Sequence, residues 1–280
     1  MNAKKLLIIP VLLITLGTWA QEANLTMKPV AKKKYNVELN TQTDVTQSMQ
    51  GMEMKMGATS FAKAVMEIEE IAANGDFTVL SAWKEIAVTS SAMGKDTTIR
   101  AENLNINMKT VYDKSGKILK NEQVGTTEKS DMATETIKQI AKNLKFPILA
   151  AKYVKKGDTW KFVTNDTVQT AESPFAMTVN AEEQYSFTGT ETKDGSEYYR
   201  IDVSDPVKVS GEGSQMGMDM SIEGTGTNEG YSLHNKTTLF PALIHSKMGL
   251  DMSIMVSGAQ SMAIPMTQNT SMTVTFTEVK

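Results

Sequence analysis

The chain has 280 residues, with 29 basic and 32 acidic side chains and a formal net charge of −3. Its basic runs are short, Lys32–Lys34 and Lys155–Lys156, and proteins that bind nucleic acid through an electrostatic footprint carry a longer basic stripe. We therefore expect no nucleic-acid partner. The chain has no cysteine, which excludes disulfides, thiolate metal sites, a cysteine nucleophile and a lipid anchor on an N-terminal cysteine.

Residues 1–20 have the pattern of a cleavable secretory signal peptide. Lys4 and Lys5 precede an apolar run from Leu6 to Gly17, which is too short to span a bilayer as a helix. Thr18 and Ala20 place small residues where a signal peptidase reads the chain. We expect cleavage after Ala20 and a periplasmic or secreted protein that does not span a membrane.

Residues 21–125 are predicted to form an N-terminal β half. Apolar and polar residues alternate over 35–45 and again over 77–83, the pattern of half-buried strands. The stretch 60–76 shows both helical spacing and alternation, and it contains Asn74-Gly75, a strong hairpin dipeptide. We favour a hairpin there, with a shift in the alternation near Glu70.

Residues 126–150 are predicted to form a helical connector. Ser130 is a suitable N-cap, and five apolar residues then make one face of a helix over 131–145: Ala133, Ile137, Ile140, Ala141 and Leu144. Pro147 cannot continue the helix. This is the one main helix that the sequence predicts.

Residues 151–280 are predicted to form a C-terminal β half. Lys193-Asp194-Gly195 separates two strand-like runs and predicts a hairpin. Towards the C-terminus, apolar residues recur with one parity in three triplets, at positions 252, 254 and 256, then 262, 264 and 266, then 272, 274 and 276. This spacing predicts three short antiparallel strands with turns at Ser257–Gln260 and Thr267–Thr270. Pro265 cannot donate a ladder hydrogen bond, so it indicates an edge, a bulge or a loop.

Together these elements predict a mainly β protein, of a β-rich α+β class. We expect a large curved antiparallel sheet or half-open barrel, built from two similar halves, with the main helix packed on it. The similarity of the halves is a hypothesis of internal duplication.

The stretch Phe146–Phe162, "FPILAAKYVKKGDTWKF", contains Pro147 and the run Gly157-Asp158-Thr159-Trp160. Together with the signal peptide and the strands rich in Met and Gly, it resembles an uncharacterised family of exported bacterial proteins, the domain of unknown function numbered six-two-six-three. That family is seen mainly in Bacteroidetes-type envelopes. The long strands with one helix are also similar, at the level of fold, to periplasmic lipoprotein carriers, curved half-open barrels that bind apolar ligands. A likeness of fold alone does not imply a shared function.

Methionine is the chemically distinctive residue, with 20 in the chain. Residues two apart on a strand share a face, so two Met-x-Met-x-Met segments and the C-terminal triplets would gather on one surface. The predicted ligand-binding residues are Met52, Met54, Met56, Met216, Met218, Met220, Met252, Ile254, Met262 and Ile264. Thioethers also suit Cu(I), and Met is an adaptable core filler.

The leading hypothesis is an exported, non-enzymatic protein that binds an apolar or lipid-like ligand, or a hydrophobic partner such as an envelope protein, through a Met-lined β face. A structural envelope module with a sealed core and a Cu(I)-binding protein are the alternatives. Ile and Val take the same positions as Met in the C-terminal triplets, which favours a hydrophobic surface over a metal site. We expect no catalytic residues, no metal site and no cofactor, because the sequence shows no nucleophile–base set.

Overall fold

The computed structural model describes residues 22–49, 51–125, 137, 140, 144–168, 175–215, 218–257 and 261–280. Thirteen strands are assigned in these ranges. They are β1 (Glu22–Asn24), β2 (Lys34–Met49), β3 (Met52–Ile71), β4 (Phe77–Ala92), β5 (Lys95–Tyr112), β6 (Ile118–Val124), β7 (Tyr153–Lys155), β8 (Thr159–Val168), β9 (Phe175–Lys193), β10 (Ser196–Gln215), β11 (Met218–Asn235), β12 (Pro241–Ser257) and β13 (Met262–Glu278). No helix in these ranges is long and apolar enough to cross a bilayer.

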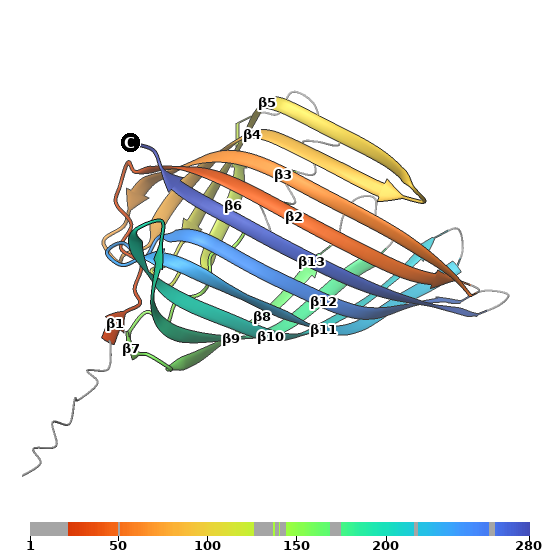
Figure 1. The fold of residues 1–280 in the computed structure, drawn as a ribbon. Helices are drawn as coiled ribbons and strands as arrows, with labels where there is room; N and C mark the ends of the chain where they lie inside the picture. Colours follow the sequence, from red (N-terminus) through yellow and green to blue (C-terminus); the bar gives the residue numbers. More distant parts are fainter. Residues whose placement is uncertain are drawn as a thin grey trace, which may run out of the picture.

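One large antiparallel sheet dominates the fold (Figure 1). It contains 11 strands in the order β6-β5-β4-β3-β2-β13-β12-β11-β10-β9-β8, while β1 and β7 form a separate two-stranded sheet. The two predicted β halves therefore occupy the two sides of a single sheet and meet where β13 pairs with β2. The prediction of a large curved antiparallel sheet is confirmed. In the described residues the sheet is open, with β6 and β8 at its edges.

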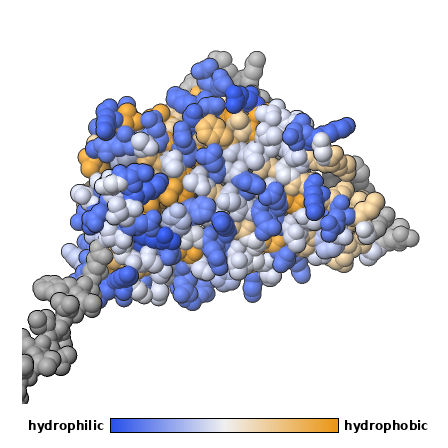
Figure 2. Space-filling model, in the orientation of Figure 1, coloured by the Kyte–Doolittle hydropathy of each residue, from blue (hydrophilic) through white to orange (hydrophobic). Residues whose placement is uncertain are grey.

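Residues paired directly across an antiparallel ladder lie on the same face of the sheet. Val37 pairs with Ala64, Ala64 with Trp83 and Trp83 with Ile106, and all four side chains are buried in the main core. We call this the inner face, because the sheet curls around it (Figure 1). The alternate residues face outward, and the surface seen in Figure 2 is mainly hydrophilic.

One end of the sheet, which we call the capped end, is covered by two segments of chain. The N-terminal segment crosses it: Met27 donates its backbone N–H to the carbonyl of Lys114 and Lys28 donates to Thr238. Aromatic side chains pack beneath, with the rings of Tyr112 and Phe146 stacked at 4.6 Å between centroids. The hairpins β2–β3 and β4–β5 turn at the opposite end, which we call the distal end.

The 144–155 segment links the two edges of the sheet. The indole N–H of Trp160 on β8 donates to the carbonyl of Ile148 at 2.7 Å, and the N–H of Leu149 donates to the carbonyl of Ser115, in the turn before β6, at 2.8 Å. The curled sheet is thus bridged across its opening at the capped end.

Most of the helix predicted over 131–145 lies outside the described residues, and no main helix is among the described elements. Ile137 and Ile140 are described and helical, and the N–H of Leu144 donates to the carbonyl of Ile140 at 2.8 Å. The predicted signal peptide lies outside the described residues too. The internal duplication stays a prediction.

The C-terminal strands correct one expectation. The triplets at 262–266 and 272–276 belong to a single strand, β13, so the turn predicted at Thr267–Thr270 is wrong. Those residues pair on both sides, with Gly249–Asp251 and neighbouring residues of β12 and with Thr43–Thr46 of β2. Thr is β-branched and favours strands, so the polar run continues the ladder. Pro265, for which the sequence predicts an edge, a bulge or a loop, instead lies in β13, an inner strand, and pairs with Ser253 of β12. It precedes by one residue the start of the pairing with β2, so it has no ladder partner on that side.

Candidate functional site

The predicted site residues gather on the inner face, over its distal half. Across β12 and β13, Met252 pairs with Met266, Ile254 with Ile264 and Val256 with Met262. Across β11 and β12, Met220 pairs with Val256, and Gln47 of β2 lies between Met266 and Met54. All predicted site residues that the structure describes therefore share one face. Met216 lies outside the described residues.

These residues differ widely in exposure. Met252 and Ile264 are buried, Met54, Met220, Ile254 and Met262 are half-buried, and Met56 and Met218 are exposed. Met52, at the tip of the β2–β3 hairpin, is 65% exposed. Met252 belongs to a second apolar cluster on the same face, formed by the buried residues Val207, Val209, Ile222, Leu250 and Met252. Val256 pairs with Met220 and Met262 across the ladders. Aliphatic residues therefore occupy the same face as Met, which is typical of a hydrophobic surface and not of a thioether metal site.

Strand β11 has glycine at two positions directly opposite apolar residues of β12. A side chain at Gly224 would overlap that of Met252, and one at Gly226 would overlap the backbone oxygen of Gly249. Both residues belong to the run Gly224-Thr225-Gly226, which the sequence could only associate with close approach or bending. Glycine at these two positions lets β11 and β12 approach closely beneath Met252.

A polar belt separates the two apolar regions of the inner face. It runs along Glu183, Asp205, Asn228, Thr270 and Thr43, on β9, β10, β11, β13 and β2, and is interrupted on β12, where Met248 lies between Asn228 and Thr270. The amide of Asn228 donates to Asp205 Oδ2 at 2.9 Å, and the hydroxyls of Thr43 and Thr270 are 3.2 Å apart. The main core lies on the capped side of this belt and the methionine cluster on the distal side.

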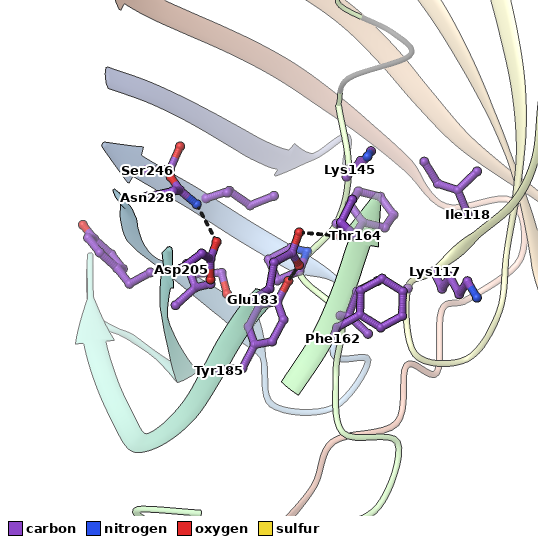
Figure 3. A pocket seen from close by; sticks show the side chains of 18 of the residues that line it. Lys117, Ile118, Lys145, Phe162, Thr164, Glu183, Tyr185, Asp205, Asn228 and Ser246 are labelled. Atoms are coloured by element: carbon purple, nitrogen blue, oxygen red, sulfur yellow. Dashed lines mark hydrogen bonds between the residues drawn. The ribbon is translucent and has the colours of Figure 1, made fainter. Parts of the chain in front are cut away.

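A cavity of about 580 Å³ opens between the polar belt and the 144–155 segment. Its lining comes from both edges of the sheet: Lys117 just before β6 and Ile118 at its start, and Phe162 and Thr164 on β8. Phe146, Ile148, Val203, Ile244 and Met272 add apolar walls. Figure 3 shows Glu183, Tyr185 and Asp205 together on one side of this space, with Lys117 and Ile118 on the other. The volume is within the range of small-molecule sites.

The two carboxylates of the cavity, Glu183 and Asp205, accept hydrogen bonds from neutral groups. Glu183 accepts hydrogen bonds from the hydroxyls of Thr164, at 3.0 Å, and Tyr185. Asp205 accepts one from the backbone N–H of Gln184 at 3.1 Å, besides that from Asn228. Burial, with the nearby charge of Glu183, raises the pKa of Asp205 to about 6. Burial also raises the pKa of Tyr185, which stays protonated.

The two histidines have structural roles in the described residues. His234 is fully buried, with Nδ1 2.8 Å from the carbonyl of Leu239 and Nε2 2.9 Å from the Ser232 hydroxyl. Burial lowers the pKa of His234 to about 4, so the ring is neutral. His245 contacts Thr273 through Nδ1 at 3.0 Å. Among the described residues, no group of three or more His, Asp or Glu is placed to hold a metal ion.

Sequence reasoning did not find the cavity. Glu183 and Asp205 occupy positions where the parity of their strands calls for apolar residues, as at Tyr185 and Phe187 or Val203 and Val207. A charged residue at a core position is the signal that could have singled them out. Lys117 and Phe162 join them only through the curl of the sheet, which periodicity does not reveal.

No protein-family model and no curated protein matches the chain. Among solved structures, an outer membrane channel from Pseudomonas putida F1 is similar, with 9% sequence identity over 89% of this chain and 97% of that chain, and a TM-score of 0.24. OccK8 (OprE) and OpdQ of Pseudomonas aeruginosa are each 7% identical, cover 90% and 89% of this chain and 100% and 98% of their own, and have TM-scores of 0.20 and 0.19. At these TM-scores the likenesses support no inference, and the site is interpreted from its own geometry.

Proposed function

We propose that this is an exported, non-enzymatic binding protein of the bacterial envelope that holds an apolar or lipid-like ligand against its inner face. The observation that carries the proposal is the inner face itself, which is apolar again beyond the polar belt and ends in exposed methionines. Met52 and Met56 remain exposed there, and Met54 is half-buried. Exposed methionines gathered at one site are typical of surfaces that accept varied apolar partners.

Two further features support the proposal. The cavity at the capped end has apolar walls beside its polar groups and lies on the same inner face as the methionines. The pattern of residues 1–20 supports export to the periplasm or beyond. A core sealed on every side would leave the distal methionines buried, so their exposure favours a binding surface over a structural module.

A dye-binding experiment tests the proposal. We expect the folded protein to bind 1-anilinonaphthalene-8-sulfonate, and we expect the double variant Met54→Gln, Met56→Gln to bind it several-fold more weakly. The matched control is Glu53→Gln, Lys55→Gln, which changes the same strand on its outward face. It should bind the dye as the unmodified protein does, with thermal unfolding of both variants measured alongside.

Native mass spectrometry provides the second readout. Protein recovered from the secreting cell is expected to carry a lipid-like adduct that is lost on denaturation. A preparation with neither adduct nor dye binding would overturn the proposal.

A further inference from the structure

Two carboxylates lie side by side in the wall of the cavity without a basic partner. Ser204 on β10 pairs with Gln184 on β9. The strands are antiparallel, so Asp205, which follows Ser204, lies opposite Glu183, which precedes Gln184, and both are on the inner face. Among the described residues, neither forms an ion pair. Their hydrogen-bond partners are the neutral groups of Thr164, Tyr185, Gln184 and Asn228.

This arrangement is unfavourable for the protein alone. Asp205 is only 3% exposed, and a buried carboxylate loses hydration that neutral hydrogen bonds restore only in part. The charge of Glu183 adds repulsion. Groups that cost stability without a compensating partner are concentrated at functional sites.

The rest of the cavity suits a hydrocarbon chain. Phe162, Val203, Ile244 and Met272 lie around the carboxylates, and the cavity volume of about 580 Å³ leaves room for a small amphiphile. Lys117, a basic residue of the lining, is exposed and lies across the space from Glu183 and Asp205 (Figure 3). Its ammonium group is 5.5 Å from the centre of the Phe162 ring. Lys145, the other lysine of the lining, is also exposed. Asp205 is thus the buried charge of the site, with the half-buried Glu183 beside it.

We propose that the cavity selects amphiphiles with a protonated amine head group, which Glu183 and Asp205 bind by charge-assisted hydrogen bonds while the chain lies along the apolar wall. This inference rests on the proposed function, because it names the class of ligand that the inner face holds. An ammonium group could donate hydrogen bonds to both carboxylates and would compensate one of their two negative charges. A neutral alcohol would leave them charged, and an anion would be repelled.

Calorimetric titration with three ten-carbon amphiphiles tests the selectivity: decylamine, decanol and decanoate, each below its micellar concentration at about pH 7.5, where the amine is protonated. We expect decylamine to bind about tenfold or more tightly than decanol, and decanoate to bind most weakly. Asp205→Asn and Glu183→Gln should each weaken decylamine binding towards that of decanol and leave decanol binding unchanged.

The matched control is Glu182→Gln. Glu182 is the neighbour of Glu183 on the outward face, where it is exposed and pairs with Lys161. The Glu182→Gln variant removes one negative charge from β9, as Glu183→Gln does, and should not alter decylamine binding. Loss of binding by this variant to the same degree as by Glu183→Gln would assign the effect to net charge and overturn the inference.

The remaining outcomes separate this inference from the proposed function. Equal binding of decylamine and decanol, or tighter binding of decanoate, overturns the amine selectivity while dye binding at the methionines still supports an apolar-ligand protein. Absence of binding by all three amphiphiles, together with absence of dye binding, overturns both.

Discussion

Met252 on β12 lies directly opposite Met266 on β13, and both side chains face the interior of the curled sheet. The methionines along this face fall into two populations. At the capped end, Met27, Met66 and Met108 are buried in the main core. At the distal end, Met52 is 65% exposed.

Mild oxidation should separate these two populations. Peroxide converts an accessible thioether to the sulfoxide, and its rate follows exposure. We expect Met52 and Met93, which is 80% exposed, to oxidise much faster than Met66 and Met108, as measured by mass spectrometry of proteolytic peptides. Similar rates at all four positions would show that the distal methionines are as sealed as the core, the result that a purely structural module requires.

Gly226 should be intolerant of a side chain because β12 approaches it closely. A Cβ atom there would overlap the carbonyl oxygen of Gly249, a backbone atom that cannot rotate away. We expect Gly226→Ala to lower the free energy of unfolding by about 1–3 kcal/mol, measured by urea denaturation. Gly57→Ala on β3 is the control, because its Cβ would meet the nearest atom at 3.6 Å, an ordinary contact. Equal stability of the two variants would refute the packing argument.

Periodicity predicted much of this sheet. The alternation over 35–45 belongs to β2, and the hairpin at Asp194-Gly195 joins β9 to β10. The expected shift near Glu70 is present as an irregularity between Ile68 and Glu70 in the ladder of β3 with β4. Parity also placed the methionines on one face. These features depend on local spacing, which the sequence contains directly.

The remaining features depend on long-range geometry. Alternation cannot show how far a sheet curls, so it could not bring Lys117 beside Phe162. It also could not separate a polar turn from a polar stretch of strand: Thr267–Thr270 continues β13 because β2 and β12 supply partners on both sides. The cavity combines both effects, since its residues come from opposite edges of the sheet.

Trp160 is expected to hold the 144–155 segment in place at the cavity. Its indole N–H donates to the carbonyl of Ile148 at 2.7 Å, and its ring stacks on Tyr185 with 5.7 Å between centroids. Trp160→Phe keeps a ring but removes the donor, at a cost of about 1 kcal/mol. We expect faster hydrogen exchange at the amide of Leu149, which is bonded to Ser115.

Trp83→Phe is the control for this measurement. The Trp83 indole N–H is buried in the main core and has no hydrogen-bond partner in the described residues, so the variant removes no such bond. It should lower global stability through lost packing without selectively accelerating exchange at Leu149. Selective acceleration in both variants would show that Trp160 has no specific role in holding the segment.

The ionisation of Asp205 should make the protein less stable as pH rises. Its pKa in the folded state is raised to about 6 by burial, against 3.8 in the absence of the fold. Between these values the folded protein retains a proton that the unfolded chain releases, so the free energy of unfolding falls as pH increases through this window. Above about pH 6 the loss is complete and amounts to at most about 3 kcal/mol.

Asp205→Asn removes this charge, and the Asn228 amide can rotate to supply the acceptor that an amide at 205 needs. We therefore expect Asp205→Asn to be more stable than the unmodified protein near pH 7.5 and to lose that advantage near pH 4, in urea denaturation at both values. The other charged or titratable groups around the cavity are the same in both proteins: Glu183, Lys117, Lys145, His245, Tyr185 and Tyr231. The control is Asp251→Asn, which changes an exposed residue on the outward face of β12 and should show no such crossover.

A different result would contradict this interpretation. If Asp205→Asn were less stable than the unmodified protein at both pH values, the Asp205 carboxylate would be needed for stability, as the acceptor of the hydrogen bonds from Asn228 and Gln184. If Asp205→Asn is more stable than the unmodified protein but binds decylamine more weakly, then the Asp205 carboxylate serves ligand binding at a cost in stability.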